Sequence, residues 1–120
     1  MTRKNKNRFV ILMLLYLPFL AVAGEANVVD VSYQCAQTCS FSVTIQHDDE
    51  GWKHYANRWE ILSIDRTIIA TRVLAHPHSK APFTRSLSNI KLPKNTHEVI
   101  VRAHDLIHGY GGKELKIKLK

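Results

Sequence analysis

The sequence predicts an all-β domain, and three observations lead to that prediction. Apolar and polar residues alternate with a period of two through most of the chain, as they do in strands that bury one face. No window of helical period stands out beside this alternation. Clusters of turn-forming residues separate the alternating segments at short intervals. Seven short strands are therefore expected.

The first three expected strands each show one apolar face. They cover residues 27–34, 39–47 and 58–64. The side chains expected to point inward from them are Val29, Val31, Tyr33, Phe41, Val43, Ile45, Trp59 and Ile61. Asp65 and Arg66 then form a turn.

The remaining four strands follow the same rule. Residues 67–74 are rich in β-branched side chains, and residues 84–92 run up to Pro93, which cannot continue a ladder. The last two expected strands are residues 98–104 and 113–119. Their inward-facing residues are Val99, Val101, Ala103, Leu115, Ile117 and Leu119.

Seven strands with regular turns are typical of a two-sheet sandwich. Trp59 on the third strand matches the core tryptophan of immunoglobulin-like domains, but both cysteines lie in the first hairpin and cannot link two sheets. The sequence thus predicts a seven-stranded immunoglobulin/fibronectin-III-like antiparallel β-sandwich. The fibronectin-III arrangement fits better than an antibody-type domain. Architecture alone implies no function.

The amino terminus reads as a secretory signal peptide of residues 1–23. A basic start, an apolar run from Phe9 to Leu20 and an A-x-A site ending at Ala23 are its three parts. Cleavage after Ala23 leaves one domain, residues 24–120, while an uncleaved anchor is the weaker alternative. The apolar run is short for a bilayer, so we expect no stable membrane span. The expected location is the periplasm or the exterior of a bacterium.

Removal of the signal peptide also changes the charge. Four of the 17 basic residues lie before residue 24, which leaves 13 basic against 10 acidic residues in the domain. A net charge of +3 spread along the chain does not predict nucleic-acid binding.

Cys35 and Cys39 are the two cysteines of the chain. In an oxidising compartment we expect a local disulfide, which closes a very small loop and constrains the unfolded chain little. A C-x3-C thiol pair for copper or redox chemistry stays open as the alternative, although redox pairs more often use C-x-x-C beside a βαβ pattern.

Histidines gather in three loops. Connections between successive strands alternate between the two ends of a seven-stranded sandwich. The loops that follow the second, fourth and sixth expected strands should therefore emerge at the same end. Six of the seven histidines lie in these loops or at their edges, and only His97 lies elsewhere. Imidazole is the commonest metal ligand in proteins and suits copper and zinc. The candidate metal ligands are His47, His54, His76, His78, His104 and His108.

Within this set the expected roles differ. His76-Pro77-His78 places two imidazoles on one face of an extended segment that Pro77 stiffens. His47 continues the inward parity of Ile45 and should lie at the rim of the core. His104 has the opposite parity from Ala103 and reaches this end only if its strand bends or ends there. The expected ligand set is His76, His78 and His47, with one of His54, His104 or His108.

Acidic residues share these loops and could orient imidazoles from behind. The acidic candidates for this supporting role are Asp48, Asp49 and Asp105, and Glu50 lies in the same loop as the first two. Arg85 is a further candidate, as a residue that pairs with one of these acids and braces the loops. The acidic run 48–50 matches no EF-hand spacing and is otherwise a solvated turn.

Three stretches, GWKHYANRWE, TRVLAHPHSKAPFTRSL and VRAHDLIHGYGGK, resemble a group of small secreted bacterial proteins to which no activity is attached. The resemblance spans most of the domain. It implies a single secreted domain and a bacterial source, and nothing about function.

Three functions remain open. The first is a periplasmic or secreted metal-binding protein that holds copper, slightly preferred, or zinc through histidines of the three loops. The second is a metal-free module that binds a protein or a glycan with the same loops. The third is an enzyme, which we do not expect: no G-x-S-x-G elbow is present, and 97 residues leave little room for a deep cleft.

Overall fold

The computed structural model describes residues 24–120, so the expected signal peptide lies outside the described residues. This part contains seven antiparallel strands and no helix. The strands are β1 (Asn27–Cys35), β2 (Cys39–Gln46), β3 (Ala56–Leu62), β4 (Ile68–Val73), β5 (Phe83–Ile90), β6 (Glu98–Asp105) and β7 (Leu115–Lys118). Within residues 24–120 no helix is long and apolar enough to cross a membrane.

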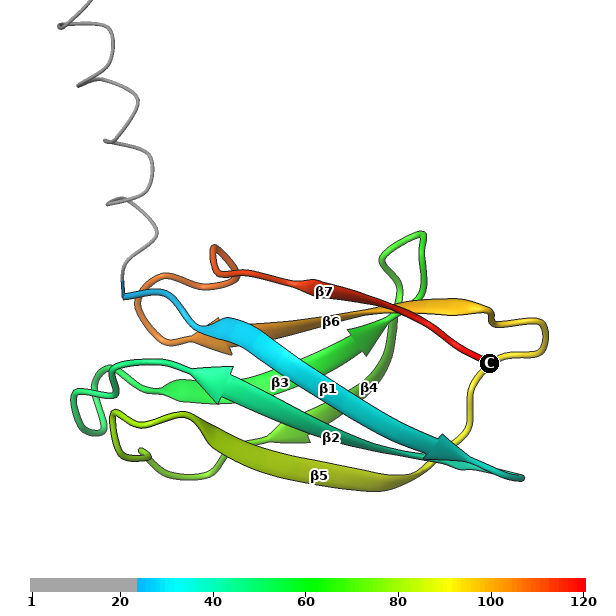
Figure 1. Ribbon diagram of the computed structural model, residues 1–120. Coiled ribbons are helices and arrows are strands. Elements are labelled where there is room, and N and C mark those ends of the chain that lie inside the picture. Colours follow the sequence, from blue (N-terminus) through cyan, green and yellow to red (C-terminus); the bar gives the residue numbers. More distant parts are fainter. Residues whose placement is uncertain (1–23) are drawn as a thin grey trace, which may run out of the picture.

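The strands form two sheets that face each other (Figure 1). One sheet has the order β1-β2-β5, and the other has the order β4-β3-β6-β7. Both sheets are antiparallel throughout. All seven predicted strands are present, with ends that differ from the expected ones by a few residues.

The core lies between the sheets. Trp59 is its largest fully buried side chain, and Phe41 and Ile45 of β2 pack with it. The strict alternation of buried and partly buried residues along β2 matches the period-two pattern of the sequence. The expected inward face of this strand is therefore confirmed, and it extends beyond the strand to His47.

The first strand departs from its expected pattern at one position. Val28 is fully buried, whereas Val29, which was expected to face inward, is exposed. The pairing register with β2 shifts between Val28 and Asp30, so Val29 is an extra residue in a β-bulge. The bulge restores Val31 and Tyr33 to the core side, where both pack against the core.

The three histidine-bearing loops emerge at one end of the sandwich (Figure 1). They are the connections β2–β3, β4–β5 and β6–β7. We call this end the histidine pole. The β1–β2 hairpin, in which Cys35 and Cys39 form a disulfide, lies at the opposite end.

Candidate metal centre

His47 directly follows β2, at the point where the core meets the histidine pole. Its parity places it inward, and only 2% of the residue is exposed. Nδ1 lies 2.5 Å from Oδ1 of Asp49, and Nε2 lies 3.2 Å from Oδ2 of Asp105. Both carboxylates are buried as well. One imidazole thus stands between two acids inside the protein.

Asp105 ends β6 and is fully buried. Its Oδ1 accepts hydrogen bonds from the backbone N–H groups of Ile107, at 2.8 Å, and His108, at 2.5 Å. Burial by itself would raise the pKa of Asp105, but these N–H groups and the neighbouring His108 and His47 rings hold it below its usual range. Asp105 is therefore a carboxylate anion at neutral pH.

Two further imidazoles face Asp105. Nε2 of His54 lies 3.5 Å from Oδ1, and Nδ1 of His108 lies 3.2 Å from Oδ2. The other nitrogen of His54, Nδ1, lies 2.6 Å from Oε1 of Glu50, and this contact lowers the pKa of Glu50. His54 and His108 come from loops β2–β3 and β6–β7, and the His108 side chain is the more exposed, at 35%.

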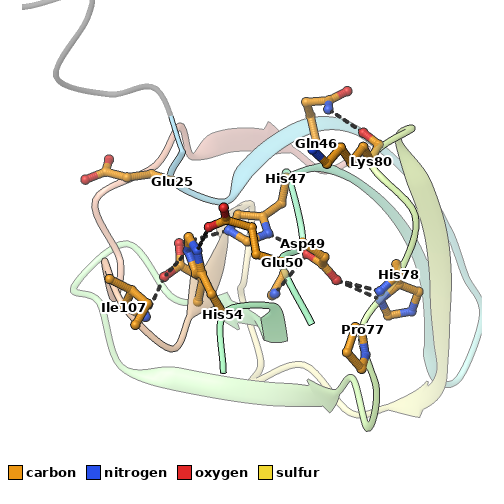
Figure 2. A network of polar contacts seen from close by, with 12 residues as sticks. Glu25, Gln46, His47, Asp49, Glu50, His54, Pro77, His78, Lys80 and Ile107 are labelled. Atoms are coloured by element: carbon orange, nitrogen blue, oxygen red, sulfur yellow. Dashed lines mark hydrogen bonds and ion pairs between the residues drawn. The ribbon is translucent and has the colours of Figure 1, made fainter. Parts of the chain in front are cut away.

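His47 and His54 are held in the same way. Each has Nδ1 against a carboxylate, of Asp49 or Glu50, and each turns Nε2 toward Asp105. Such a carboxylate fixes the ring tautomer with the proton on Nδ1 and leaves a lone pair on Nε2. Figure 2 shows His47 and His54 close to each other, with Asp49 and Glu50 beside them.

In that tautomer the centre contains lone pairs that face an anion. Nε2 of His47 and Oδ2 of Asp105 are then both acceptors at hydrogen-bond distance, which requires a proton or another cation between them. Nε2 of His54 is buried and has no hydrogen-bond partner. The ion pairs of Asp49 and Asp105 within residues 24–120 are with histidines alone. The centre is thus short of positive charge.

The distances suit one ion. Ligand atoms of His47, His54 and Asp105 lie within 4.8 Å of one another. In a tetrahedral zinc site with bonds of about 2.0–2.1 Å, neighbouring ligand atoms are about 3.3–3.4 Å apart. Oδ2 of Asp105 lies 3.2 Å from Nε2 of His47 and 3.2 Å from Nδ1 of His108, and Oδ1 lies 3.5 Å from Nε2 of His54. We call His47, His54, His108 and Asp105 the central cluster.

Ring positions agree with the same picture. Two imidazoles that share one ion at these bond lengths have centroids about 4.5–5.2 Å apart, from square-planar to tetrahedral angles. The centroids of His47 and His54 are 4.9 Å apart, and those of His54 and His108 are 5.0 Å apart.

The structure places His76 and His78 beside the central cluster and not in it. His78 lies on the far side of Asp49 from His54 (Figure 2), and its backbone N–H donates to Oδ2 of Asp49 at 2.5 Å. The ring of His78 stacks on Phe83, and His76 is exposed. The expectation that these two join His47 as ligands of one ion does not match this placement.

Three other candidates also lie away from the centre. His104 faces the outer side of its sheet, as its parity indicated, and its Nδ1 lies 2.6 Å from Oδ1 of Asn57. Arg85 bonds the carbonyl of Thr84 and lies over Phe83, so the expected pairing with a loop acid is not formed. Asp48 is exposed and makes no side-chain hydrogen bond among the described residues.

Two features were missed by the sequence reasoning. Asp105 was expected to orient the histidines from outside the ligand set, but it lies in the middle of the cluster. Its position at the end of a core strand was the feature of the sequence that could have indicated this. Glu60 is buried on the outer face of β3, where Arg58, Arg102 and Tyr110 bond its carboxylate. No spacing in the sequence indicated this second cluster, because its members come from β3, β6 and the β6–β7 loop and meet only in the folded protein.

Comparison with known proteins gives one relative, and it does not assign a function. The chain is 46% identical over 95 residues to a protein of Halomicrobium mukohataei described as "Putative lipoprotein". The match covers 78% of this chain and 47% of that protein, so the chain spans about half the length of the relative it matches. No family model matches the chain. No solved structure matches it either.

Proposed function

We propose that the protein is a metal-binding β-sandwich of the cell envelope or the exterior, and that its central cluster holds one zinc ion. One observation supports this most strongly: two imidazoles, each oriented by a carboxylate at Nδ1, turn Nε2 toward the buried anion Asp105. His108 supplies the fourth donor. The role is to buffer or deliver the metal.

Zinc takes the place of copper as the preferred metal because the donor set is no longer all histidine. Three imidazoles and one carboxylate suit tetrahedral zinc, whereas Cu(II) favours tetragonal arrangements of donors. Cu(II) remains the competing ion, since affinity for nitrogen donors rises toward copper along the first transition row.

Storage or delivery fits this cluster better than catalysis. A catalytic zinc site keeps one position open for water, whereas four protein donors fill a tetrahedron. The exposed His108 is the donor that a receiving molecule reaches first. We therefore do not propose an enzyme.

The fold belongs with the immunoglobulin/fibronectin-III-like sandwiches in this proposal. The division into β1-β2-β5 and β4-β3-β6-β7 joins the fourth strand to the third, and Trp59 fills the core from the third strand. The lipoprotein description of the relative and the signal-like residues 1–23 both support a location in the envelope or outside the cell.

Titration calorimetry tests the function. We expect the chelator-treated protein to bind one equivalent of Zn(II) with a dissociation constant at or below the micromolar range. His54→Ala should weaken binding at least 100-fold, because it removes a donor at the centre. His97→Ala, at the opposite end, is the matched control and should bind like the wild type. No heat from the wild type, or equal heats from both variants, would sink the proposal.

A second candidate function has its own supporting observation. Trp52 is 67% exposed and Ile107 is 63% exposed, and they belong to the two loops that supply His54 and His108. Exposed apolar side chains gathered on loops at one end are typical of a recognition surface. In a metal-free protein- or glycan-binding module, ligand added in the presence of a chelator should shift the fluorescence of Trp52. That shift should weaken in Ile107→Ser and stay unchanged in Ile64→Ser, which alters an exposed apolar residue of the β3–β4 turn at the other end.

A further inference from the structure

The HPH segment forms a second pair of imidazoles outside the central cluster. The ring centroids of His76 and His78 are 4.8 Å apart with their planes tilted by 36°. This is the same spacing as the 4.9 Å and 5.0 Å found for the ring pairs of the central cluster. It falls within the range of about 4.5–5.2 Å that two imidazoles on one ion require.

Both rings are fixed in place. His78 stacks on Phe83 with centroids 3.8 Å apart and planes within 5°, and its side chain is 5% exposed. Nδ1 of His76 lies 2.9 Å from the carbonyl oxygen of Pro77, which only an Nδ1–H group can satisfy. Nε2 of His76 therefore carries the free lone pair, on an exposed residue.

His78 has an unsatisfied nitrogen that faces an acid. Nδ1 is buried without a hydrogen-bond partner and lies 3.7 Å from Oδ2 of Asp49. The same Asp49 holds Nδ1 of His47 through its other oxygen. A proton on Nδ1 of His78 is favoured by that carboxylate, and it leaves Nε2 as the donor atom.

We propose that His76 and His78 form a second, weaker site that takes Cu(II) through their two Nε2 atoms. Two imidazoles with water in the remaining positions suit a tetragonal Cu(II) ion better than zinc. The cationic Arg85 near His78 and the small number of protein donors make this site weaker than the central cluster. The inference is independent of the zinc assignment, since it shares no ligand with the central cluster.

The test is the stoichiometry of Cu(II) binding, measured by calorimetry and by electron paramagnetic resonance. The wild type should bind two equivalents, the second at least 10-fold more weakly, with two distinct spectra. His76→Ala should bind one equivalent and lose the weaker spectrum. His97→Ala, which removes an exposed histidine at the other end, should still bind two. His54→Ala should lose the tight equivalent and keep the weaker one.

Each failure has a separate meaning. A single tight equivalent in the wild type that His76→Ala keeps, or two equivalents in His76→Ala, overturns the second site and leaves the central cluster unaffected. A single weak Cu(II) equivalent that His76→Ala abolishes supports the second site, and the Zn(II) titration described above then tests the proposed function separately. His76 is exposed, so a circular dichroism spectrum that matches the wild type should confirm that its variant folds.

Discussion

Nε2 of His47 lies 3.2 Å from Oδ2 of Asp105, although the two residues are 58 positions apart in the chain. The contact joins the end of β2, in one sheet, to the end of β6, in the other. It therefore forms only when the sandwich is assembled, and an ion bound there connects the two sheets.

Asp105→Asn should remove the negative charge and keep the shape of the side chain. We expect the affinity for Zn(II) to fall more than about 100-fold, because changes even to groups behind metal ligands cost 10–100-fold. Competition with a chromogenic chelator measures the change. Asp48→Asn, which removes an exposed charge from the same pole, is the control. Equal losses in the two variants would show that only the net charge matters.

Zinc should stabilise the whole domain, since the proposed ligands come from both sheets. A ligand at 100 times its dissociation constant adds about 2.7 kcal/mol, which raises Tm by roughly 10–20 °C in a domain of this size. Differential scanning calorimetry with and without zinc gives the shift, and excess chelator should reverse it. A Tm that does not respond to zinc contradicts a site that spans the sheets.

Glu60 should make the stability of the domain depend on pH in the acidic range. Burial alone would raise its pKa, but hydrogen bonds from Arg102, Arg58 and Tyr110 hold the pKa below the usual range. A carboxyl group with a lowered pKa contributes stability above its unfolded pKa and loses it as the pH falls through the folded pKa. Glu60→Gln should lower the free energy of unfolding by about 3 kcal/mol at pH 7. The difference in this free energy between the variant and the wild type should shrink below about pH 4.

Urea unfolding of both proteins across that pH range is the measurement. Glu98→Gln, on the neighbouring strand β6, serves as the control for a carboxylate in a strand. A cost of Glu60→Gln that is the same at pH 7 and pH 3 would show that the carboxylate charge does not stabilise this cluster.

The Cys35–Cys39 disulfide should affect stability and not metal binding. It closes a five-residue loop at the end opposite the histidine pole, for which chain entropy predicts a loss of about 2 kcal/mol on removal. Replacing both cysteines with serine should therefore lower the urea midpoint and leave the Zn(II) affinity within twofold. A loss of metal binding in this variant would contradict the placement of the metal at the histidine pole.

The sequence predicted the strands well because each one repeats a two-residue pattern that the core enforces. The pattern along Phe41, Val43 and Ile45 even placed His47 at the rim of the core, and the opposite parity of His104 correctly indicated a different face. The bulge at Val29 was not predictable, since one extra residue leaves no mark on a pattern of adjacent valines.

The histidine pole was predictable from the number of strands, but the residues that come together there were not. Which loop residues turn inward depends on backbone paths that hydrogen bonds fix, such as the turn in which Asp105 accepts the N–H groups of Ile107 and His108. The pair His76 and His78 looked like the rigid half of the shared site. Asp49 lies between this pair and His47: its Oδ1 contacts Nδ1 of His47, and its Oδ2 accepts the backbone N–H of His78.

The most direct test of the central cluster is X-ray absorption at the zinc edge of the zinc-loaded protein. We predict four nitrogen or oxygen ligands at about 2.0–2.1 Å, with the multiple scattering of three imidazoles. His54→Ala should reduce the imidazole count by one. A shell of six oxygens without imidazole scattering, or sulfur at about 2.3 Å, would contradict the assignment of zinc to His47, His54, His108 and Asp105.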